Sequence, residues 1–162
     1  NIVGWFQGRT EFGARALGNR SILANPHLPD VRDRINKVVK KREMFRPFAP
    51  SVTIEDYQKY FASEEDVPYM NQVVKVKEEY KDKLPAVTHV DGSARVQTVY
   101  RYTIIHDLLM EFEKLSGYPI LLNTSFNIKD KTMVLTPKDA VDTFFDTDMD
   151  ILVMGNYVMY KN

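Results

Sequence analysis

A helix followed at once by a buried strand is the clearest pattern in the sequence. Residues 103–117, TIIHDLLMEFEKLSG, place apolar side chains at helical spacing and end at Gly117, a residue type that commonly terminates helices. Residues 118–126, YPILLNTSF, form a short apolar run that becomes polar at its end. This run predicts a buried strand leading into a turn. Any fold for this chain must accommodate this long helix and this strand in direct succession.

The rest of the chain mixes strands and helices without strict alternation. Helices are predicted at 31–42, with Asp30 as cap, at 54–61 and at 136–147. Extended segments or strands are predicted at 2–6, 21–26, 48–54, 69–76, 86–90 and 94–100, and a hairpin at 150–160 turns at Gly155-Asn156. The pattern predicts an α/β domain of α+β-like character, with a mixed sheet.

Length and charge limit the possible classes of function. The 162 residues fit one domain, and the 22 Lys and Arg balance the 22 Asp and Glu. Because the net charge is zero, any anion site must come from local clustering rather than from an overall field that attracts nucleic acid or membranes. There is no Cys, no signal peptide and no apolar run near the length that spans a bilayer. We expect a cytoplasmic protein with no membrane partner.

The chain begins at Asn1 inside a strand-like segment. We interpret it as a fragment of a longer polypeptide, or a processed chain, so that another domain supplies part of the chemistry. Exposed apolar residues on the first strand, such as Trp5 or Phe6, would then mark the missing interface.

Cations are concentrated in residues 40–52, KKREMFRPFAPSV. Lys41 and Arg42 are expected to be solvated charges at the end of a helix. Arg46 is different, because it lies between Phe45 and Pro47, and an apolar, stiff setting favours a long cation only if an anion meets it. A structural salt bridge is the alternative for Arg46.

Two further polar clusters have the composition of an anion site. In EFGARALGNRS, Arg15 and Arg20 offer planar donor groups beside glycines, although either arginine could instead tie the loop to Glu11. In LLNTSFN, four polar residues follow a buried strand, where open α/β sheets place ligands, although an ordinary Asx or Ser/Thr turn has the same composition. These four residues are Asn123, Thr124, Ser125 and Asn127.

Other residues give weaker signals. Arg95 follows a Gly turn at the start of a strand and carries little weight alone. His27, His89 and His106 are scattered without the spacing of metal ligands, so no metal site is expected in this chain.

Four stretches together resemble the C-terminal domain of the nodulation-protein and antibiotic-biosynthesis O-carbamoyltransferases. In chain order these are FQGRTEFGARALGNRSILANP, INKVVKKREMFRPFAPSV, PAVTHVDGSARVQTV and PILLNTSFNIKDKTMVLTPKDAVDTFFDTDMDILVMGNYVM. The resemblance runs from about residue 4 to the end. It assigns residues 1–162 to one YrdC-like domain, a twisted, open, mixed parallel and antiparallel sheet with flanking helices around a basic cavity.

The resemblance also implies a reaction. Such domains use ATP, with Mg²⁺ bound to its phosphates, and carbamoyl phosphate to make carbamoyl adenylate. A preceding domain, absent here, carries an iron site and passes the carbamoyl group to a hydroxyl acceptor that this sequence does not identify. YrdC-like enzymes share Lys-x-Arg and Ser-x-Asn signatures. Ser125-Phe126-Asn127 matches the second, and the first falls either on Lys40-Lys41-Arg42 or on Lys40 with Arg46.

The resemblance and the residues predict the same chemistry. Lys40, Arg46 and Arg95 are expected to be catalytic, with Arg46 held by its prolines to face the cavity and Lys40 beside it. The expected nucleotide- and substrate-binding residues are Arg15, Asn123, Ser125, Asn127, Arg20 and Thr124.

Two alternatives remain open at this point. The domain could bind nucleotide and dock on a partner domain without turnover of its own, which ATP–pyrophosphate exchange would test. It could also be an RNA-binding module of the same fold. The neutral net charge and the lack of an aromatic and basic stripe argue against RNA.

Overall fold

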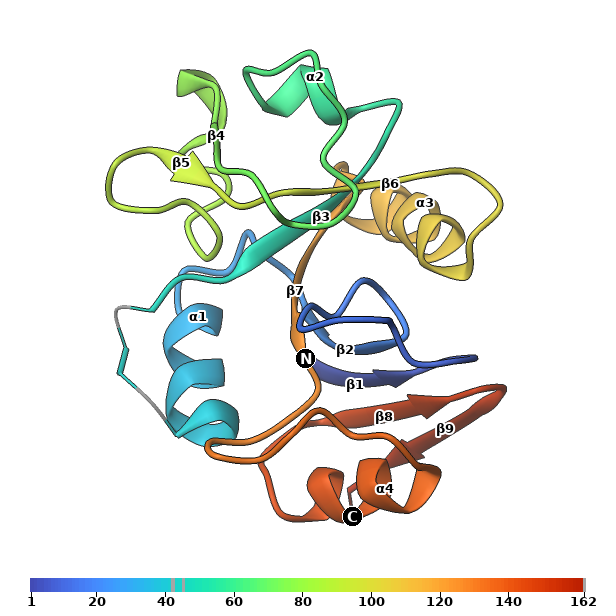
Figure 1. Cartoon of the computed structure of the whole chain (residues 1–162). Helices are drawn as coiled ribbons and strands as arrows, with labels where there is room; N and C mark the ends of the chain where they lie inside the picture. The colour runs from blue at the N-terminus through green and yellow to red at the C-terminus, as the bar shows by residue number, and fades with distance from the viewer. Residues whose placement is uncertain (42, 45, 162) are drawn as a thin grey trace.

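A seven-stranded mixed sheet forms the centre of the molecule (Figure 1). The computed structural model describes residues 1–41, 43–44 and 46–161. The strand order is β6-β3-β7-β2-β1-β8-β9, in which β1 pairs parallel with β8 and β3 parallel with β6, while the other neighbours are antiparallel. The strands of this sheet are β1 (Ile2–Phe6), β2 (Arg20–Ala24), β3 (Ala49–Thr53), β6 (Gln97–Val99), β7 (Ile120–Ser125), β8 (Ile151–Met154) and β9 (Tyr157–Tyr160).

The remaining elements flank this sheet. A small second sheet pairs β4 (Val74–Lys75) with β5 (Ser93–Ala94). The helices are α1 (Val31–Arg34), the π-helical segment η1 (Ile35–Lys40), α2 (Tyr57–Tyr60), the 3-10 turn η2 (Glu78–Tyr80), α3 (Ile104–Ser116) and α4 (Pro137–Phe145). Within the described residues, no helix is both long enough and apolar enough to cross a bilayer.

Two apolar cores lie on the two faces of the sheet. The larger core contains Ile35 and Val39 of η1 together with Phe144 of α4 and Leu122 of β7. The smaller core packs Ile105 and Leu109 of α3 against Trp5, Leu23, Val99 and Leu121. Helices α1 and α4 cover one face of the sheet, and α3 covers the other. A mixed sheet with helices on both faces confirms the expected mixed α/β fold.

Sequence capping signals located the two longest helices well. Thr103 accepts a hydrogen bond from the backbone N–H of His106, and Gly117 ends α3 with a left-handed φ of 80°. Thr136 and Asp139 form a reciprocal capping box at the start of α4, with Pro137 in the first turn. These signals are local, so the sequence alone places both ends.

Other predictions need correction. Asp30 precedes α1 but its side chain makes no capping hydrogen bond. The predicted helix at 31–42 is α-helical for four residues and then continues as the π-helical turn η1. Residues 86–90 form turns rather than a strand, and the predicted strand at 69–76 is reduced to the two residues of β4.

The first strand is also buried, contrary to expectation. Trp5 and Phe6 are each 7% exposed, so neither marks an uncovered interface. The Trp5 indole Nε1 donates to the Gly18 carbonyl at 2.8 Å. Gly18 has a φ of 112°, and a Cβ at this position would lie 2.9 Å from Ile105 Cβ. Gly18 therefore lets the loop between β1 and β2 lie against both Trp5 and α3.

Candidate functional site

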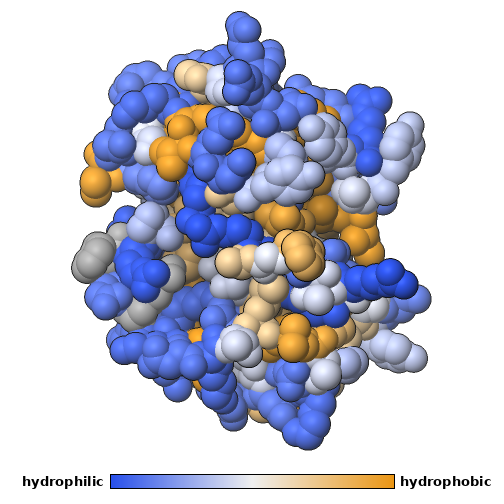
Figure 2. Space-filling view, viewed as in Figure 1, coloured by the Kyte–Doolittle hydropathy of each residue, from blue (hydrophilic) through white to orange (hydrophobic). Residues whose placement is uncertain are grey.

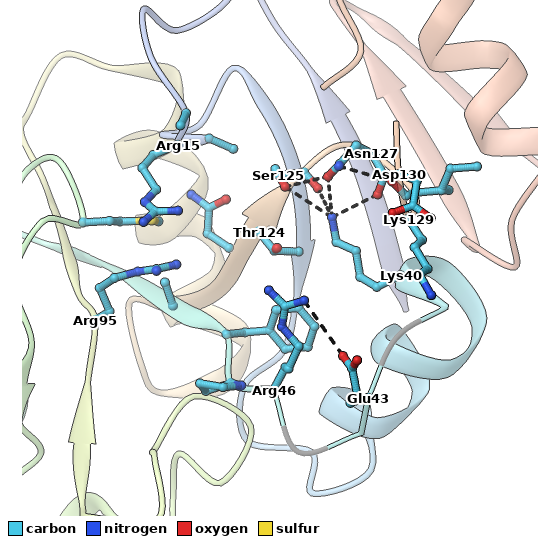
Figure 3. A pocket seen from close by; sticks show the side chains of 18 residues that line it. Arg15, Lys40, Glu43, Arg46, Arg95, Thr124, Ser125, Asn127, Lys129 and Asp130 are labelled. Atoms are coloured by element: carbon cyan, nitrogen blue, oxygen red, sulfur yellow. Dashed lines mark hydrogen bonds and ion pairs between the residues drawn. The ribbon is translucent and has the colours of Figure 1, made fainter. Parts of the chain in front are cut away.

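A cavity of about 480 Å³ opens at the carboxyl end of β7 and is lined mainly by polar and charged residues. Five segments far apart in the sequence meet there: the loop between β1 and β2, Lys40 and Glu43 with residues 46–49, Met70, Arg95, and residues 123–130. The lining residues are Ala14, Arg15, Ala16, Lys40, Glu43, Arg46, Pro47, Phe48, Ala49, Met70, Arg95, Asn123, Thr124, Ser125, Asn127, Ile128, Lys129 and Asp130. Figure 3 shows cationic side chains from three of these segments directed into one space.

Lys40 is buried and holds the loop after β7 in place. Its side chain is 5% exposed, and its Nζ donates to the Ser125 carbonyl at 2.5 Å, to the Asn127 carbonyl at 3.0 Å and to Asn127 Oδ1 at 2.8 Å. The Ser125 hydroxyl donates to the same Asn127 Oδ1 at 2.6 Å. These contacts, drawn in Figure 3, join Lys40 of the Lys-x-Arg region to the Ser-x-Asn region. Lys40 and Ser125 are 85 residues apart in the sequence.

The wider turn of η1 places Lys40 at this loop. Ile35 and Val39 are fully buried against the sheet, and Lys41 ends the segment with a left-handed φ of 48°. Lys41 is exposed, as expected for a solvated charge. The corresponding expectation for Arg42 lies outside the described residues.

Arg15 and Arg95 form a pair of like charges on the opposite wall. Both guanidinium groups point into the same part of the cavity in Figure 3. Burial, and then the charge of Arg15, lower the pKa of Arg95, and its buried Nε has no hydrogen-bond partner among the described residues. Two neighbouring guanidinium groups without a bound anion raise the electrostatic energy of the protein, and this arrangement suits an anionic ligand.

Arg46 lines the cavity, but its surroundings differ from those expected. Its side chain is 53% exposed, and its Nη1 lies 3.9 Å from Glu43 Oε2, so the guanidinium group is not desolvated. The preceding backbone is fixed instead by Asn36, which is fully buried and whose Nδ2 donates to the carbonyls of Met44 and Arg46 at 3.1 and 3.0 Å. The proposed role of Arg46 therefore rests on its position, because the desolvation argument is wrong.

The residues at the end of β7 also lie as the sequence suggested. Asn123, Thr124, Ser125 and Asn127 all line the cavity. The Asn127 amide donates to the carbonyls of Ile128 and Lys131 at 3.2 and 2.8 Å, which leaves its oxygen directed to Lys40. The turn that follows β7 is thus held by side-chain contacts from two directions.

Arg20 is placed elsewhere. It is 4% exposed, it is absent from the cavity lining, and its guanidinium donates to the carbonyls of Gln7 and Gly8 at 2.7 and 3.1 Å while stacking on Phe6. Glu11 accepts the backbone N–H groups of Leu17 and Asn19, each at 2.7 Å. Arg20 and Glu11 therefore shape the loop that presents Arg15, and the expectation that Arg20 contacts ligand is corrected.

Several residues that shape the cavity were not singled out from the sequence. Asn36, Ser51 and Gln97 are buried polar residues in predicted helices or strands, and buried amide groups within such segments are the signal that could have identified them. Met70 lines the cavity with a left-handed φ of 53°, which is uncommon for a residue other than glycine. No local pattern indicates that Met70 adopts this conformation.

Cationic side chains outnumber carboxylates in the described lining of the cavity. In the space-filling view, strongly hydrophilic side chains gather at the waist of the molecule, between the part containing α2 and α3 and the part containing α4 (Figure 2). The described lining residues include two carboxylates, Glu43 and Asp130. They also include five cations, Arg15, Lys40, Arg46, Arg95 and Lys129. The described residues contain no group of three His, Cys, Asp or Glu that could hold a metal ion.

The fold and the site together define a mixed-sheet α/β domain with a cation-lined cavity at the end of its central strand. The family model described as carbamoyltransferase C-terminus matches residues 1–161. The chain therefore belongs to the carbamoyltransferase C-terminus family.

Similar proteins agree with this assignment. The chain is 52% identical to nodulation protein NolNO of Sinorhizobium fredii (99% of this chain, 24% of that protein). It is 44% identical to 3'-hydroxymethylcephem-O-carbamoyltransferase of Amycolatopsis lactamdurans (86% of this chain, 27% of that protein). A crystal structure of full-length HypF, in a phosphate- and nucleotide-bound form, shares the fold with a TM-score of 0.66 at 22% identity, over 96% of this chain and 23% of HypF. The chain thus spans about a quarter of the length of these relatives.

Proposed function

We propose that this chain binds ATP and carbamoyl phosphate in the cation-lined cavity and forms carbamoyl adenylate. An N-terminal domain of the full protein would then transfer the carbamoyl group to a hydroxyl acceptor. The convergence of Arg15, Arg95 and Arg46 on one cavity is the observation that supports this proposal most strongly. Membership of a carbamoyltransferase family and the fold shared with nucleotide-bound HypF add support.

The proposed reaction requires the protein to hold several negative charges together. The triphosphate and carbamoyl phosphate repel one another. In the proposed sequence, water first cleaves carbamoyl phosphate into carbamate and inorganic phosphate. A carbamate oxygen then attacks the α-phosphorus of ATP, the bond from this phosphorus to the bridging oxygen breaks, and pyrophosphate leaves. Arg15, Arg46 and Arg95 would neutralise the phosphates, which lowers the barrier by positioning and electrostatic stabilisation. Lys40 would act indirectly, by fixing Ser125 and Asn127.

Magnesium would arrive with ATP. Glu43 and Asp130 are the described carboxylates of the lining, and they come from separate segments, so Mg²⁺ would be held mainly by the phosphates. The iron expected for the full protein would belong to the N-terminal domain.

Turnover tests the proposal directly. We expect the purified protein to release pyrophosphate from ATP and Mg²⁺ when carbamoyl phosphate is present, and to show ATP–pyrophosphate exchange under the same conditions. Nucleotide binding without either activity would contradict adenylate formation and favour a domain that only binds and docks.

Replacing Arg46 with alanine is expected to weaken ATP binding without unfolding the protein. Arg46 is half exposed, so the free energy of unfolding should change by less than about 0.5 kcal/mol. Loss of one charge-assisted phosphate contact should raise the Kd for Mg·ATP about tenfold or more in calorimetric titration. Arg32→Ala, in α1 and outside the cavity lining, is the matched control. Wild-type affinity in the Arg46 variant would remove Arg46 from the site.

A further inference from the structure

Only the nitrogen of the Asn123 side-chain amide has hydrogen-bond partners among the described residues. The residue is 1% exposed and lines the cavity. Its Nδ2 donates to Ser51 Oγ at 2.9 Å and to Gln97 Oε1 at 3.1 Å, whereas its Oδ1 is buried and has no hydrogen-bond partner among the described residues. A buried acceptor without a donor is unfavourable, and in a residue that lines a cavity an N–H or O–H group of a bound molecule can satisfy it.

The orientation of this amide follows from a chain of hydrogen bonds. The Leu17 carbonyl can only accept, so the Gln97 group that meets it at 2.9 Å must be the NH2. Gln97 Oε1 therefore faces the other way, where it accepts from the Ser51 hydroxyl at 2.6 Å and from Asn123 Nδ2. Asn123 must use its NH2 for these contacts, so its buried Oδ1 is the polar atom of this cavity-lining side chain that has no hydrogen-bond partner among the described residues.

The sheet register brings the three side chains together. Ser51 pairs with Gln97 across β3 and β6, and Ala49, two residues before Ser51, pairs with Asn123 across β3 and β7. Residues directly opposite each other, or two apart on a strand, lie on the same face, so Ser51, Gln97 and Asn123 form one polar row. Glu11 holds the backbone of the loop that supplies the Leu17 carbonyl.

We propose that Gln97 and Ser51 orient Asn123 so that its Oδ1 accepts from the amino group of carbamoyl phosphate, and that this contact selects a carbamoyl over an acetyl group. The inference rests on the proposed function. The oxygens of fully ionised phosphate esters and carboxylates carry no proton to donate, so they cannot satisfy Asn123 Oδ1. The planar carbamoyl group has an NH2 at the position where an acetyl group has a methyl. Arg15, Arg46 and Arg95 bind phosphate and cannot distinguish the two compounds.

Comparison of carbamoyl phosphate with acetyl phosphate tests this inference without any substitution. The two compounds have similar size and charge, and acetyl phosphate cannot donate a hydrogen bond from its methyl group. We expect the purified full chain to bind carbamoyl phosphate about ten- to a hundredfold more tightly in calorimetric titrations without ATP. Omission of ATP removes its adenine amino group and its ribose hydroxyls as competing donors.

Substitutions then locate the source of the selectivity. In Gln97→Leu, the Ser51 hydroxyl loses its acceptor and can donate to Asn123 Oδ1, so the amide turns and presents NH2 to the ligand. We expect the affinity for carbamoyl phosphate to fall until it equals that for acetyl phosphate. Ser51→Ala leaves Gln97 to orient Asn123 and should keep the selectivity.

Gln7→Leu is the matched control. Gln7 is 6% exposed, donates to the Gly155 carbonyl at 3.2 Å and does not line the cavity. A loss of packing alone would lower both affinities together, as in this control, and would leave their ratio unchanged. The ratio is therefore a readout that a purely structural role of Gln97 would not move.

The outcomes separate this inference from the proposed function. If the wild-type chain binds both compounds equally, or if Gln97→Leu keeps the wild-type ratio, the role of Asn123 and Gln97 is wrong while carbamoyl phosphate binding stands. If the chain binds neither compound, both proposals fail. A wild-type preference lost in Gln97→Leu and kept in Gln7→Leu supports both.

Discussion

Replacing Lys40 with methionine is expected to lower both the stability of the protein and its nucleotide affinity. Methionine keeps much of the side-chain volume but leaves the carbonyls of Ser125 and Asn127 and Asn127 Oδ1 without their buried donor. Loss of such charge-assisted hydrogen bonds should cost roughly 2–4 kcal/mol in the free energy of unfolding, measured by urea denaturation. The loop after β7 would lose its fixed conformation, so Mg·ATP binding should weaken by about a hundredfold or more.

Lys37→Met is the control for this prediction. Lys37 lies in the same π-helical segment but is exposed, so both stability and affinity should stay at wild-type values. If Lys40→Met were as stable as the control while affinity fell, Lys40 would contact the ligand directly and its role in holding the loop would be wrong. If affinity were unchanged, Lys40 would have no part in the site.

The sequence predicted the elements whose signals are local. The interior strand β7, the helix α3 with its end at Gly117, the helix α4 and the hairpin at Gly155-Asn156 were all expected close to where they occur. The failures have a different cause. Residues 86–90, AVTHV, have strand-like composition, yet no strand forms there, because local composition does not decide whether a neighbouring strand is available for pairing.

The candidate residues found from the sequence lie in short stretches whose cationic or polar side chains are close together along the chain. Lys40, Arg46, the Ser-x-Asn turn and Arg15 line one cavity, and their roles in ligand binding are our proposal. Arg20 shows the limit of this reasoning, because its side chain has the same chemistry as that of Arg15 but is buried among backbone carbonyls. Gln97 was missed because its contacts are not local in the sequence. Its partners Ser51 and Leu17 lie 46 and 80 residues away.

Replacing Arg95 with methionine is expected to have the opposite effect on stability from the Lys40 change. In the unliganded protein, Arg95 is half-buried beside Arg15, and its Nε has no partner among the described residues. Removal of this cation relieves desolvation and repulsion between like charges. The free energy of unfolding without anions should therefore stay within about 0.5 kcal/mol of wild type or rise above it.

The Arg95→Met variant should nevertheless have a much lower affinity for Mg·ATP. The unfavourable placement of Arg95 is relieved when phosphate binds, so its contribution to affinity should be large, and the Kd for Mg·ATP should rise about a hundredfold. Thermal unfolding with and without Mg·ATP checks both effects, because a ligand at free concentration L that binds only the folded state stabilises it by RT ln(1 + L/Kd) and therefore raises Tm more the more tightly it binds. We expect Mg·ATP to raise the Tm of wild type and of Arg101→Met, an exposed control, but not that of Arg95→Met.

The two variants together separate the roles of the cations. Lys40 is buried with partners and should stabilise the protein whether or not ligand is present. The buried Nε of Arg95 has no hydrogen-bond partner among the described residues, so Arg95 should destabilise the unliganded protein. Such a cost is usual for a preorganised binding site. If Arg95→Met instead lost stability to the same extent as Lys40→Met, Arg95 would be a structural cation, and the cavity would bind its anion through Arg15 and Arg46.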